Sequence, residues 1–532
     1  MSAPSAASPA TDAACALLDA LASLGVRHVI VSPGSRSQAL ALAAAEMERR
    51  GRIRLHVRID ERQAGFTALG IGRESRVPAA VVCTSGTAVA NLLPAALEAH
   101  HSGVPLILLT ADRPPELRGV GANQTTRQPG LFGDAARFAD DAPVPVGDPG
   151  ERAAFRTLAA RAFAAAAGET VQGVAHLNLP FREPLAGEIP EWFGGAEDDD
   201  ALADAVGAFA ADPGEPTTLE QGPRTVVVAG ADAGAEAELI ARRGGWPLLA
   251  EIVSGSRFGR RAIRGYREAL GREALGGRIE RVVVVGHPTL HREVTRLLSR
   301  ADVEIVALRA TDEPLDLSGS TRAADAIAVA PGEIDRDWLG AWQDWSRDRP
   351  DARADGLDRA RLVEAVWRAT GEDDRLVFGS SRLVRVADDV LEPRAVRVHA
   401  NRGLAGIDGT IATATGIALA SGRITRVLVG DLTFLHDAGS LLLPDGEERP
   451  RVQVVVGNDR GGTIFQGLEV ARVADASAME RVQLTPQSVD LASLAAAYGW
   501  GFRRAATPDE LDDALSGDVT RPEIVEVPLP RA

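Results

Sequence analysis

Residues 426–439, RVLVGDLTFLHDAG, and residues 451–462, RVQVVVGNDRGG, each carry an acidic residue where an apolar run ends. Asp431 follows the first run and Asp459 follows the second. An unpaired carboxylate is costly beside a buried strand, so the two acids need a common explanation. Their separation, 459 − 431 = 28 residues, is enough for a strand, a crossover helix and a returning parallel strand. The pattern therefore predicts that both carboxylates lie at one edge of a parallel sheet.

The residue types at this edge favour a metal bound together with a diphosphate. Ligands bind at the carboxyl ends of strands in open parallel sheets. The two carboxylates and the carbonyl of flexible Gly461 are hard oxygen ligands that suit Mg2+, which usually keeps water and phosphate oxygens in its shell. Helix N-termini after the Gly-containing turns can help hold the diphosphate. The alternative is that both acids only cap helices.

Composition narrows the class of protein. A chain of 532 residues should form two to four domains. A net charge of -16 disfavours nucleic acid or an anionic membrane as the main partner. Only Cys15 and Cys83 are present, which predicts a reducing, cytoplasmic compartment, and no stretch suggests a signal peptide or a membrane span. The sequence contains no lysine, which excludes a P-loop lysine, a pyridoxal phosphate Schiff base and a Ser-Lys dyad.

Short Val, Ile and Leu runs alternate with Ala-rich helical stretches, which is typical of an α/β fold with parallel sheets covered by helices. We expect three such domains, the central one with strands at TVVVAG, RVVVVGHP, VEIVALRA and AIAVAP. The polar stretch before the second set of strands is typical of a linker. The predicted boundaries are 1–190 for a first domain, 191–223 for the linker, 224–345 for a central domain and 346–532 for a third domain. The GADAG turn at Gly230 lacks a full dinucleotide-binding motif and is interpreted mainly as structural.

GDLTF at 430–434 followed by NDRGGTIF at 458–465 resembles the motif of thiamine diphosphate enzymes. Leu432 stands where the third glycine is usual, and Asp459 stands where the second asparagine is usual. The resemblance implies thiamine diphosphate as cofactor, in a pyrimidine-binding first domain and a diphosphate-binding third domain. It also implies Mg2+, with Mn2+ as an alternative, bound by Asp431, Asp459 and the Gly461 carbonyl. Glu61, at a strand-to-helix transition, would be the catalytic glutamate that hydrogen-bonds the aminopyrimidine ring.

Four further motifs follow one another in the first domain: SPGSRSQALALA, CTSGTAVANLLPA, LTADRPPEL and GANQTTRQPGLFG. With ANRGLAGIDG in the third domain they resemble the 2-succinyl-5-enolpyruvyl-6-hydroxy-3-cyclohexene-1-carboxylate (SEPHCHC) synthases of menaquinone biosynthesis. The central domain matches only loosely, around GHPTLHR. The implied reaction is decarboxylation of 2-oxoglutarate, followed by 1,4-addition of the succinyl carbanion equivalent to isochorismate.

The resemblance assigns site residues by motif, and arginine suits two dicarboxylate substrates because of its fixed charge and bidentate fork. The residues expected to face isochorismate are Arg36, Arg113, Asn123, Gln124 and Arg292. Those expected to bind the 2-oxoglutarate carboxylates are Ser381, Arg385 and Arg402, with Phe465 and Leu468 as pocket walls. Those expected to contact the cofactor are Glu61, Ser381, Ile407, Gly430, Asp431, Leu432, Thr433, Asp459 and Ile464.

The resemblance further implies a homodimer or homotetramer with active sites between chains, and no nucleic-acid or membrane partner. Three alternatives remain open from the residues alone. One is another thiamine diphosphate enzyme, of the acetolactate synthase or 2-oxo acid decarboxylase type, which would not need this set of arginines. Another is a non-catalytic binding protein of the same fold, and the third is a dinucleotide-dependent dehydrogenase based on the Gly230 turn.

Overall fold

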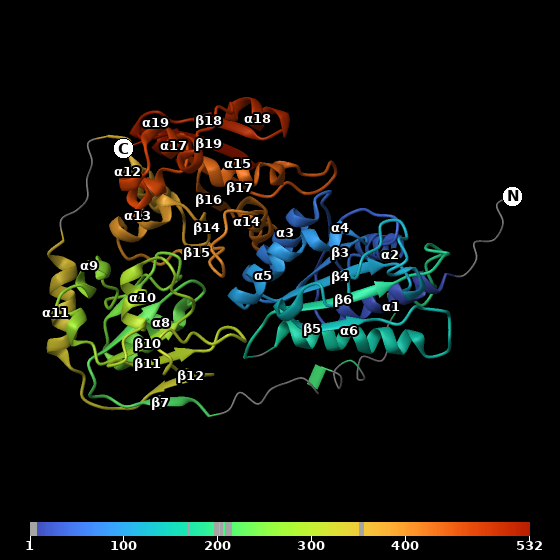
Figure 1. Cartoon of the computed structure of the whole chain (residues 1–532), viewed down its shortest axis with the longest axis horizontal. Helices are drawn as coiled ribbons and strands as arrows, with labels where there is room; N and C mark the ends of the chain where they lie inside the picture. The colour runs from blue at the N-terminus through green and yellow to red at the C-terminus, as the bar shows by residue number, and fades with distance from the viewer. Residues whose placement is uncertain are drawn as a thin grey trace. The chain divides into compact units, whose positions relative to one another are not determined.

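The computed structural model describes residues 8–168, 170–195, 202, 206–207, 215–349 and 356–531 (Figure 1). The chain forms two compact units. The first unit comprises Met1–Asp212, Leu419–Ser421 and Leu443–Glu448. The second unit comprises Pro213–Ala418, Gly422–Leu442 and Arg449–Ala532. None of the described helices is both long and apolar enough to cross a membrane.

A six-stranded parallel sheet with the order β2-β1-β3-β4-β6-β5 lies at the centre of the first unit. Its central strands are buried along their whole length, as expected for a parallel sheet with helices on both faces. The strands are β1 (His28–Val31), β2 (Arg54–Val57), β3 (Ala79–Cys83), β4 (Leu106–Asp112), β5 (Ala136–Asp141) and β6 (Val174–Pro180).

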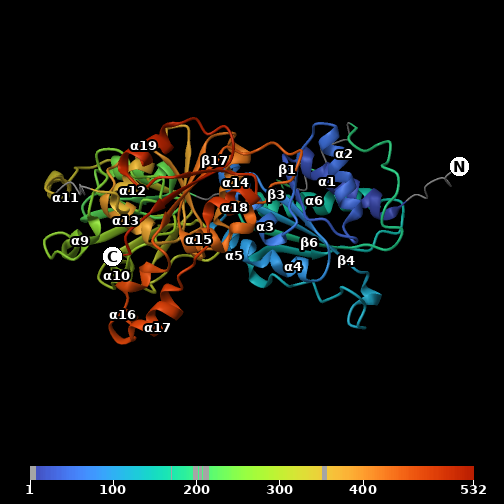
Figure 2. The same ribbon diagram turned by 90° about the horizontal axis from the view of Figure 1, so that it is seen from above.

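Helices cover both faces of this sheet. Figure 2 shows one group of three helices on one side, where their Ala and Leu side chains join the main core of the unit; this group is α1 (Pro9–Ser23), α2 (Gln38–Arg49) and α6 (Glu151–Ala167). The opposite group is α3 (Glu61–Ser75), α4 (Thr87–Asn91) and α5 (Leu93–Ser102). Short 3-10 turns η1 (Pro115–Leu117) and η2 (Gly133–Ala135) follow β4.

The first part of the second unit contains a five-stranded parallel sheet with the order β12-β11-β10-β8-β9. Its strands are β8 (Thr225–Ala229), β9 (Leu248–Ala250), β10 (Arg281–Val285), β11 (Glu304–Leu308) and β12 (Arg322–Ala324). Helix α8 (Gly234–Gly244) packs on one face of this sheet. The opposite face is covered by α9 (Tyr266–Leu270), α10 (Arg292–Leu298) and α11 (Arg336–Arg347). The 3-10 turn η3 (Gly276–Arg278) precedes β10.

One strand assignment in this region is corrected. The run AIAVAP was expected to join this sheet, but β13 (Ile327–Val329) pairs with β7 (Thr217–Leu219) in a separate two-stranded sheet. The physical reason is that β12 already occupies the position beside β11, so the next strand needs another partner. Gly230 follows β8, and a Cβ there would lie 2.0 Å from the backbone nitrogen of Pro288, which gives this glycine a packing role.

The last part of the second unit contains a six-stranded parallel sheet with the order β15-β14-β16-β17-β19-β18. Its strands are β14 (Arg375–Phe378), β15 (Arg397–Ala400), β16 (Thr425–Gly430), β17 (Val452–Asn458), β18 (Gly501–Arg504) and β19 (Glu523–Pro528). One face packs on α12 (Arg359–Ala369), α13 (Arg382–Val390) and α19 (Pro508–Ser516). The remaining elements are α14 (Thr410–Ser421), α15 (Asp431–His436), η4 (Ala438–Leu441), η5 (Thr463–Gly467), α16 (Val470–Val473), α17 (Ala476–Met479), the π-helix η6 (Glu480–Leu484) and α18 (Leu491–Ala497).

The predicted α/β class, with parallel sheets flanked by helices, is confirmed. The boundaries at 190, 223 and 345 stay a prediction. Much of the predicted linker 191–223 lies outside the described residues, and β7 occupies its last part.

Candidate active site

The two acids singled out in the sequence lie side by side at the carboxyl end of a parallel strand pair. Strands β16 and β17 are paired, and Gly430 at the end of β16 is opposite Gly457 near the end of β17. Asp431 begins α15, and Asp459 follows β17 directly. The spacing argument therefore identified the correct sheet edge.

Asp431 is held in a defined orientation. The backbone N–H of Gly461 donates to its Oδ2 at 2.7 Å, and the side chain is buried. Burial, and then the negative charge of Asp459, raise the pKa of Asp431 to about 6, against the lowering effect of backbone hydrogen bonds. A buried carboxylate whose ionisation is disfavoured by burial and by a neighbouring acid forms a site that a divalent cation would stabilise.

Asp459 is held by partners from two other elements. Nη2 of Arg359, the first residue of α12, donates to its Oδ2 at 2.7 Å, and the hydroxyl of Thr463 donates to the same oxygen at 2.6 Å. The side chains of Arg359 and Asp459 are only 8% and 10% exposed. The carboxylate that replaces the usual asparagine amide is therefore paired with a buried arginine.

A cavity of about 310 Å³ opens at this sheet edge within the second unit. It combines carboxylates, guanidinium groups and glycine backbone at one side with an apolar wall. Twelve residues assigned from the sequence line it: Ser381, Arg385, Arg402, Ile407, Gly430, Asp431, Leu432, Thr433, Asp459, Gly461, Ile464 and Phe465. Arg292 and Leu468 do not line it; Arg292 is exposed and pairs with Glu469 at 3.2 Å.

The arginines in this cavity have distinct surroundings. Arg402 donates from Nε to the hydroxyl of Thr289 at 2.9 Å and from Nη2 to the carbonyl of the same residue at 3.1 Å. Arg385 donates from Nη1 to the carbonyl of Ser381 at 3.2 Å. Burial lowers the pKa of Arg385, while the negative charge of Glu251 opposes that effect.

Glu251 is a buried acid that sequence reasoning missed. It follows β9 directly and accepts the backbone N–H groups of Leu290 at 2.8 Å and Thr289 at 3.2 Å. Burial raises its pKa to about 7, with the charge of Asp388 adding to the rise and Arg402 opposing it. The signal that could have found it is the one that found Asp431, an acid directly after an apolar strand-like run.

In the first unit the structure brings together three of the residues assigned to isochorismate. Nη1 of Arg113 donates to the hydroxyl of Ser85, and the side-chain amide of Gln124 donates to the Ser85 carbonyl at 3.0 Å. Burial, and then the positive charge of Arg36, lower the pKa of Arg113. The backbone N–H of Arg36 donates to the hydroxyl of Thr84, the neighbour of Ser85, at 3.4 Å. Asn123 is exposed, and its carbonyl accepts the Thr125 hydroxyl at 3.0 Å.

A buried amide network supports this group. The side-chain carbonyl of Gln128 accepts the backbone N–H of Gly86 at 3.0 Å, and its NH2 donates to Asn178 at 2.8 Å. Both amide side chains are fully buried. Gln128 thus ties the loop that carries Gln124 to the turn that carries Ser85.

Glu61 is the first residue of α3 and is half-buried. The carboxylate of Asp60 caps the helix by accepting the backbone N–H groups of Arg62 at 2.8 Å and Gln63 at 3.4 Å. Burial, and after it the negative charge of Glu61, raise the pKa of the Cys83 thiol at the end of β3. The carboxylate therefore stands at the carboxyl edge of the first sheet, at the strand-to-helix transition that the sequence indicated.

The turn before Glu61 is fixed by an acid from a distant part of the chain. Glu447 accepts the backbone N–H of Val57 at 2.6 Å and pairs with Nη1 of Arg58 at 2.9 Å, and all three belong to the first unit. Burial alone would raise the pKa of Glu447, but hydrogen bonds from His56 and Val57 and the charge of Arg58 lower it to about 2.

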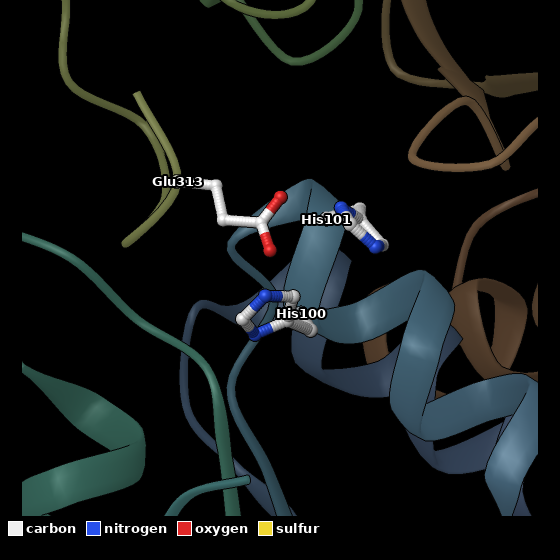
Figure 3. Close-up of side chains that lie close together, drawn as sticks. All are labelled: His100, His101 and Glu313. Atoms are coloured by element: carbon white, nitrogen blue, oxygen red, sulfur yellow. The ribbon is translucent and has the colours of Figure 1, made fainter. Parts of the chain in front are cut away.

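Figure 3 draws His100 and His101 at the end of α5, where their rings stand edge to face with centroids 4.9 Å apart. The third side chain in that view, Glu313, belongs to the second unit. We assign these three residues no metal, and the sequence shows no ligand spacing among its nine histidines.

The cavity of the second unit fits a metal-bound diphosphate. Asp431 and Asp459 supply hard oxygen atoms, and Nη1 of Arg382 is buried there without a hydrogen-bond partner among the described residues. Leu432, Ile464 and Phe465 offer an apolar surface for an aromatic ring system.

Comparison with protein families agrees with this assignment. Residues 11–131 match the thiamine pyrophosphate enzyme N-terminal TPP binding domain, and residues 384–527 match the C-terminal TPP binding domain. Benzoylformate decarboxylase from Polynucleobacter necessarius superimposes with a TM-score of 0.66 over 98% of this chain and 99% of its own, at 16% identity, so the likeness shows the fold. The fold and the site define a thiamine pyrophosphate-dependent enzyme.

Curated relatives give the family. The chain is 51% identical to the 2-succinyl-5-enolpyruvyl-6-hydroxy-3-cyclohexene-1-carboxylate synthase of Leifsonia xyli subsp. xyli, over 99% of this chain and 98% of the relative. It is 50% identical to the synthase of Clavibacter michiganensis subsp. michiganensis, over 99% and 97%, and 45% identical to that of Kineococcus radiotolerans, over 98% and 96%. The chain belongs to the SEPHCHC synthase family, and it is a thiamine pyrophosphate-dependent enzyme that forms carbon–carbon bonds.

Proposed function

We propose that the protein decarboxylates 2-oxoglutarate and adds the resulting four-carbon unit to isochorismate, giving SEPHCHC in menaquinone biosynthesis. The observation that carries the proposal is the cavity of the second unit, where a carboxylate pair and the arginines Arg385 and Arg402 share one space. Thiamine diphosphate, when bound, supplies the nucleophilic carbon and the electron sink that decarboxylation requires. The protein supplies binding, orientation and charge.

The proposal assigns Mg2+, with Mn2+ as an alternative, to Asp431, Asp459 and the Gly461 carbonyl. Its support is the buried pair of acids at the β16–β17 edge and the hydrogen bond by which Gly461 orients Asp431. A divalent ion there would neutralise both carboxylates and accept phosphate oxygens in its remaining positions. Gly430, Leu432 and Thr433 would contact the same end of the cofactor, while Ile407 and Ile464 would contact its rings.

The proposal assigns the 2-oxoglutarate carboxylates to Ser381, Arg385 and Arg402. Arg402 has its Nε and Nη2 directed to Thr289, which fixes the plane of the guanidinium group in the cavity. A planar cation held in this way suits a carboxylate geometrically. Phe465 would wall the same space, and Leu468 keeps its sequence-based assignment as a wall residue.

The proposal assigns isochorismate to the arginine-rich group of the first unit. Arg36 and Arg113 provide two cations, and Gln124 provides an amide beside them, for a substrate with two carboxylates. Asn123 and Arg292 keep their sequence-based assignments to the same substrate.

Glu61 is proposed as the residue that hydrogen-bonds the aminopyrimidine ring and holds or releases a proton there. We further propose a homodimer or homotetramer in which Glu61 of one chain completes the cavity of a partner chain. A cytoplasmic location is part of the proposal and is supported by the free buried thiols of Cys15 and Cys83.

The test is product formation by the purified protein from 2-oxoglutarate, with thiamine diphosphate and Mg2+, in the presence and absence of isochorismate. Coupled product that requires isochorismate and is lost in Glu61→Gln, while cofactor binding persists, is the expected result. Decarboxylation of other 2-oxo acids without isochorismate would retain the cofactor and refute the substrates. Ligand binding without any turnover would favour a binding protein.

A further inference from the structure

Arg382 carries a guanidinium group whose purpose the fold does not explain. It is the first residue of α13 and lines the cavity of the second unit. Its Nη1 is buried and has no hydrogen-bond partner among the described residues. A buried N–H of a charged group that lacks an acceptor is unfavourable by the full desolvation penalty of that group. An anion bound in the cavity would supply the missing acceptor.

The other arginines near this cavity are already engaged. Arg359 donates from Nη2 to Asp459 at 2.7 Å and to the carbonyl of Pro530 at 2.7 Å. Arg402 donates to Thr289 and to Ser380. Arg382 lines the same cavity, and its Nη1 has no hydrogen-bond partner among the described residues.

Arg382 and Asp459, a proposed metal ligand, line the same cavity. The charges of Arg359 and Asp459 act on Arg382, whereas the charge of Glu251 acts on Arg385, one turn further along α13. The charge of Arg402 likewise acts on Glu251, whereas Asp459, which acts on Arg382, is one of the proposed metal ligands. The two ends of the cavity suit two different anions.

The anion expected at the metal end follows from charge. The second position of the motif usually holds a neutral asparagine. Asp459 adds a negative charge at this position, beside Asp431, and this charge would repel a diphosphate. Arg359 offsets the carboxylate of Asp459 directly, which leaves Arg382 as an additional cation. The first turn of the nine-residue helix α13 also points partial positive charge toward an anion at this place.

We propose that Arg382 binds the diphosphate of the cofactor, and that with Arg359 it offsets the extra negative charge that Asp459 brings to the motif. This inference rests on the proposed function, since it requires thiamine diphosphate and the divalent ion in this cavity. It adds to that function a phosphate-binding residue that lies outside the two cofactor motifs.

The experiment compares wild type, Arg382→Met and Arg382→Lys by calorimetric titration of the full-length protein with thiamine diphosphate and with thiamine monophosphate, both with Mg2+. Loss of one charge-assisted hydrogen bond should weaken diphosphate binding by about tenfold in R382M. Monophosphate binding should change less, and R382K should recover part of the loss. Arg368→Met, on the exposed side of α12, is the matched control and should bind as wild type does.

Thermal unfolding separates a ligand role from a structural one. Without cofactor, R382M should unfold at the same temperature as wild type or higher, because a buried N–H without an acceptor is removed. With cofactor and Mg2+, R382M should gain less stability than wild type. Equal diphosphate affinity in R382M and wild type would overturn the inference, as would a raised KM for 2-oxoglutarate with unchanged cofactor affinity. A wild-type protein that binds no thiamine diphosphate would refute the proposed function itself.

Discussion

The backbone N–H of Gly461 donates to Oδ2 of Asp431 at 2.7 Å, so the second cofactor motif orients the carboxylate of the first. Gly461 has φ +127, and a Cβ at this position would lie 2.2 Å from the carbonyl oxygen of Leu484. Gly461→Ala should therefore move the backbone and misalign both proposed metal ligands. We expect Mg2+-dependent cofactor binding to weaken by roughly tenfold or more, from the loss of one charge-assisted bond and the added strain.

Titration of thiamine diphosphate binding with Mg2+ checks this expectation. Gly467→Ala is the control, because a Cβ there meets nothing within 4 Å. Unchanged Mg2+ dependence in Gly461→Ala would mean that the hydrogen bond to Asp431 does not matter for metal binding.

The pair of Asp431 and Asp459 was predictable because its signal is local. Each acid lies at the end of a strand-like segment rich in valine, and the spacing between them is long enough for a crossover helix. Strands β5, β9 and β18 gave no comparable signal. β5 alternates partly buried and exposed residues, and β9 has three residues, so their partners in the sheet are decided by tertiary contacts.

The partners of the site residues were less predictable than the residues themselves. Arg359 precedes Asp459 by 459 − 359 = 100 residues, and no motif links the two. Glu447 lies in a polar turn, where a sequence pattern would assign a solvated acid. Such contacts depend on how distant segments meet, so a single sequence can indicate the chemistry of a site before it indicates its supporting ion pairs.

The Arg359–Asp459 ion pair should be strongly coupled. Arg359→Gln leaves the carboxylate of Asp459 buried with Thr463 as its remaining side-chain donor, and we expect a loss of about 3 kcal/mol in stability. Asp459→Asn in the same chain should recover much of that loss, because the uncompensated charge is removed. Thermal unfolding of the two single variants and the double variant measures the coupling. Additive effects would show that the pair contributes no specific coupling.

The matched control for that cycle is Arg361→Gln, on the same helix. Arg361 pairs with Asp512, whose side chain is 52% exposed. Solvent screens such a pair, so the expected change is about 1 kcal/mol or less.

Glu251 should make the protein less stable as pH rises. Its folded pKa of about 7 lies above the ordinary value of 4.5, so the folded state keeps a proton that the unfolded chain releases. Between about pH 4.5 and 7 this difference lowers the stability of the folded state, and the full penalty is present above that range. Glu251→Gln should flatten this part of the profile. Unfolding temperatures measured at several pH values check this expectation, with exposed Glu273→Gln as the control. The same pH dependence of the unfolding temperature in both variants would contradict the assignment.

Glu447 should act in the opposite direction, in the acid range. Its pKa is lowered from 4.5 to about 2, so its stabilising contribution is present above about pH 4.5 and is lost as pH falls toward 2. Glu447→Gln should lower the unfolding temperature near neutral pH, and the difference from wild type should shrink in acid. Glu448→Gln, with a side chain 80% exposed, is the neighbouring control. A difference that does not vary with pH would assign Glu447 a packing role alone.

Mixing two inactive variants tests the proposed sharing of sites between chains. Glu61→Gln removes the proposed catalytic carboxylate, and Asp431→Asn removes a proposed metal ligand. If each site takes Glu61 from one chain and Asp431 from the other, a hybrid dimer has one site with both defects and one site with neither. Random reassembly of equal amounts should then restore about one quarter of wild-type activity in a dimer with two equivalent sites. If both residues serve a site from the same chain, every site in the mixture carries one defect, and activity stays at the level of the separate variants. Reassembled wild-type protein sets the reference for recovery, and tandem affinity tags on the two variants confirm that hybrids have formed.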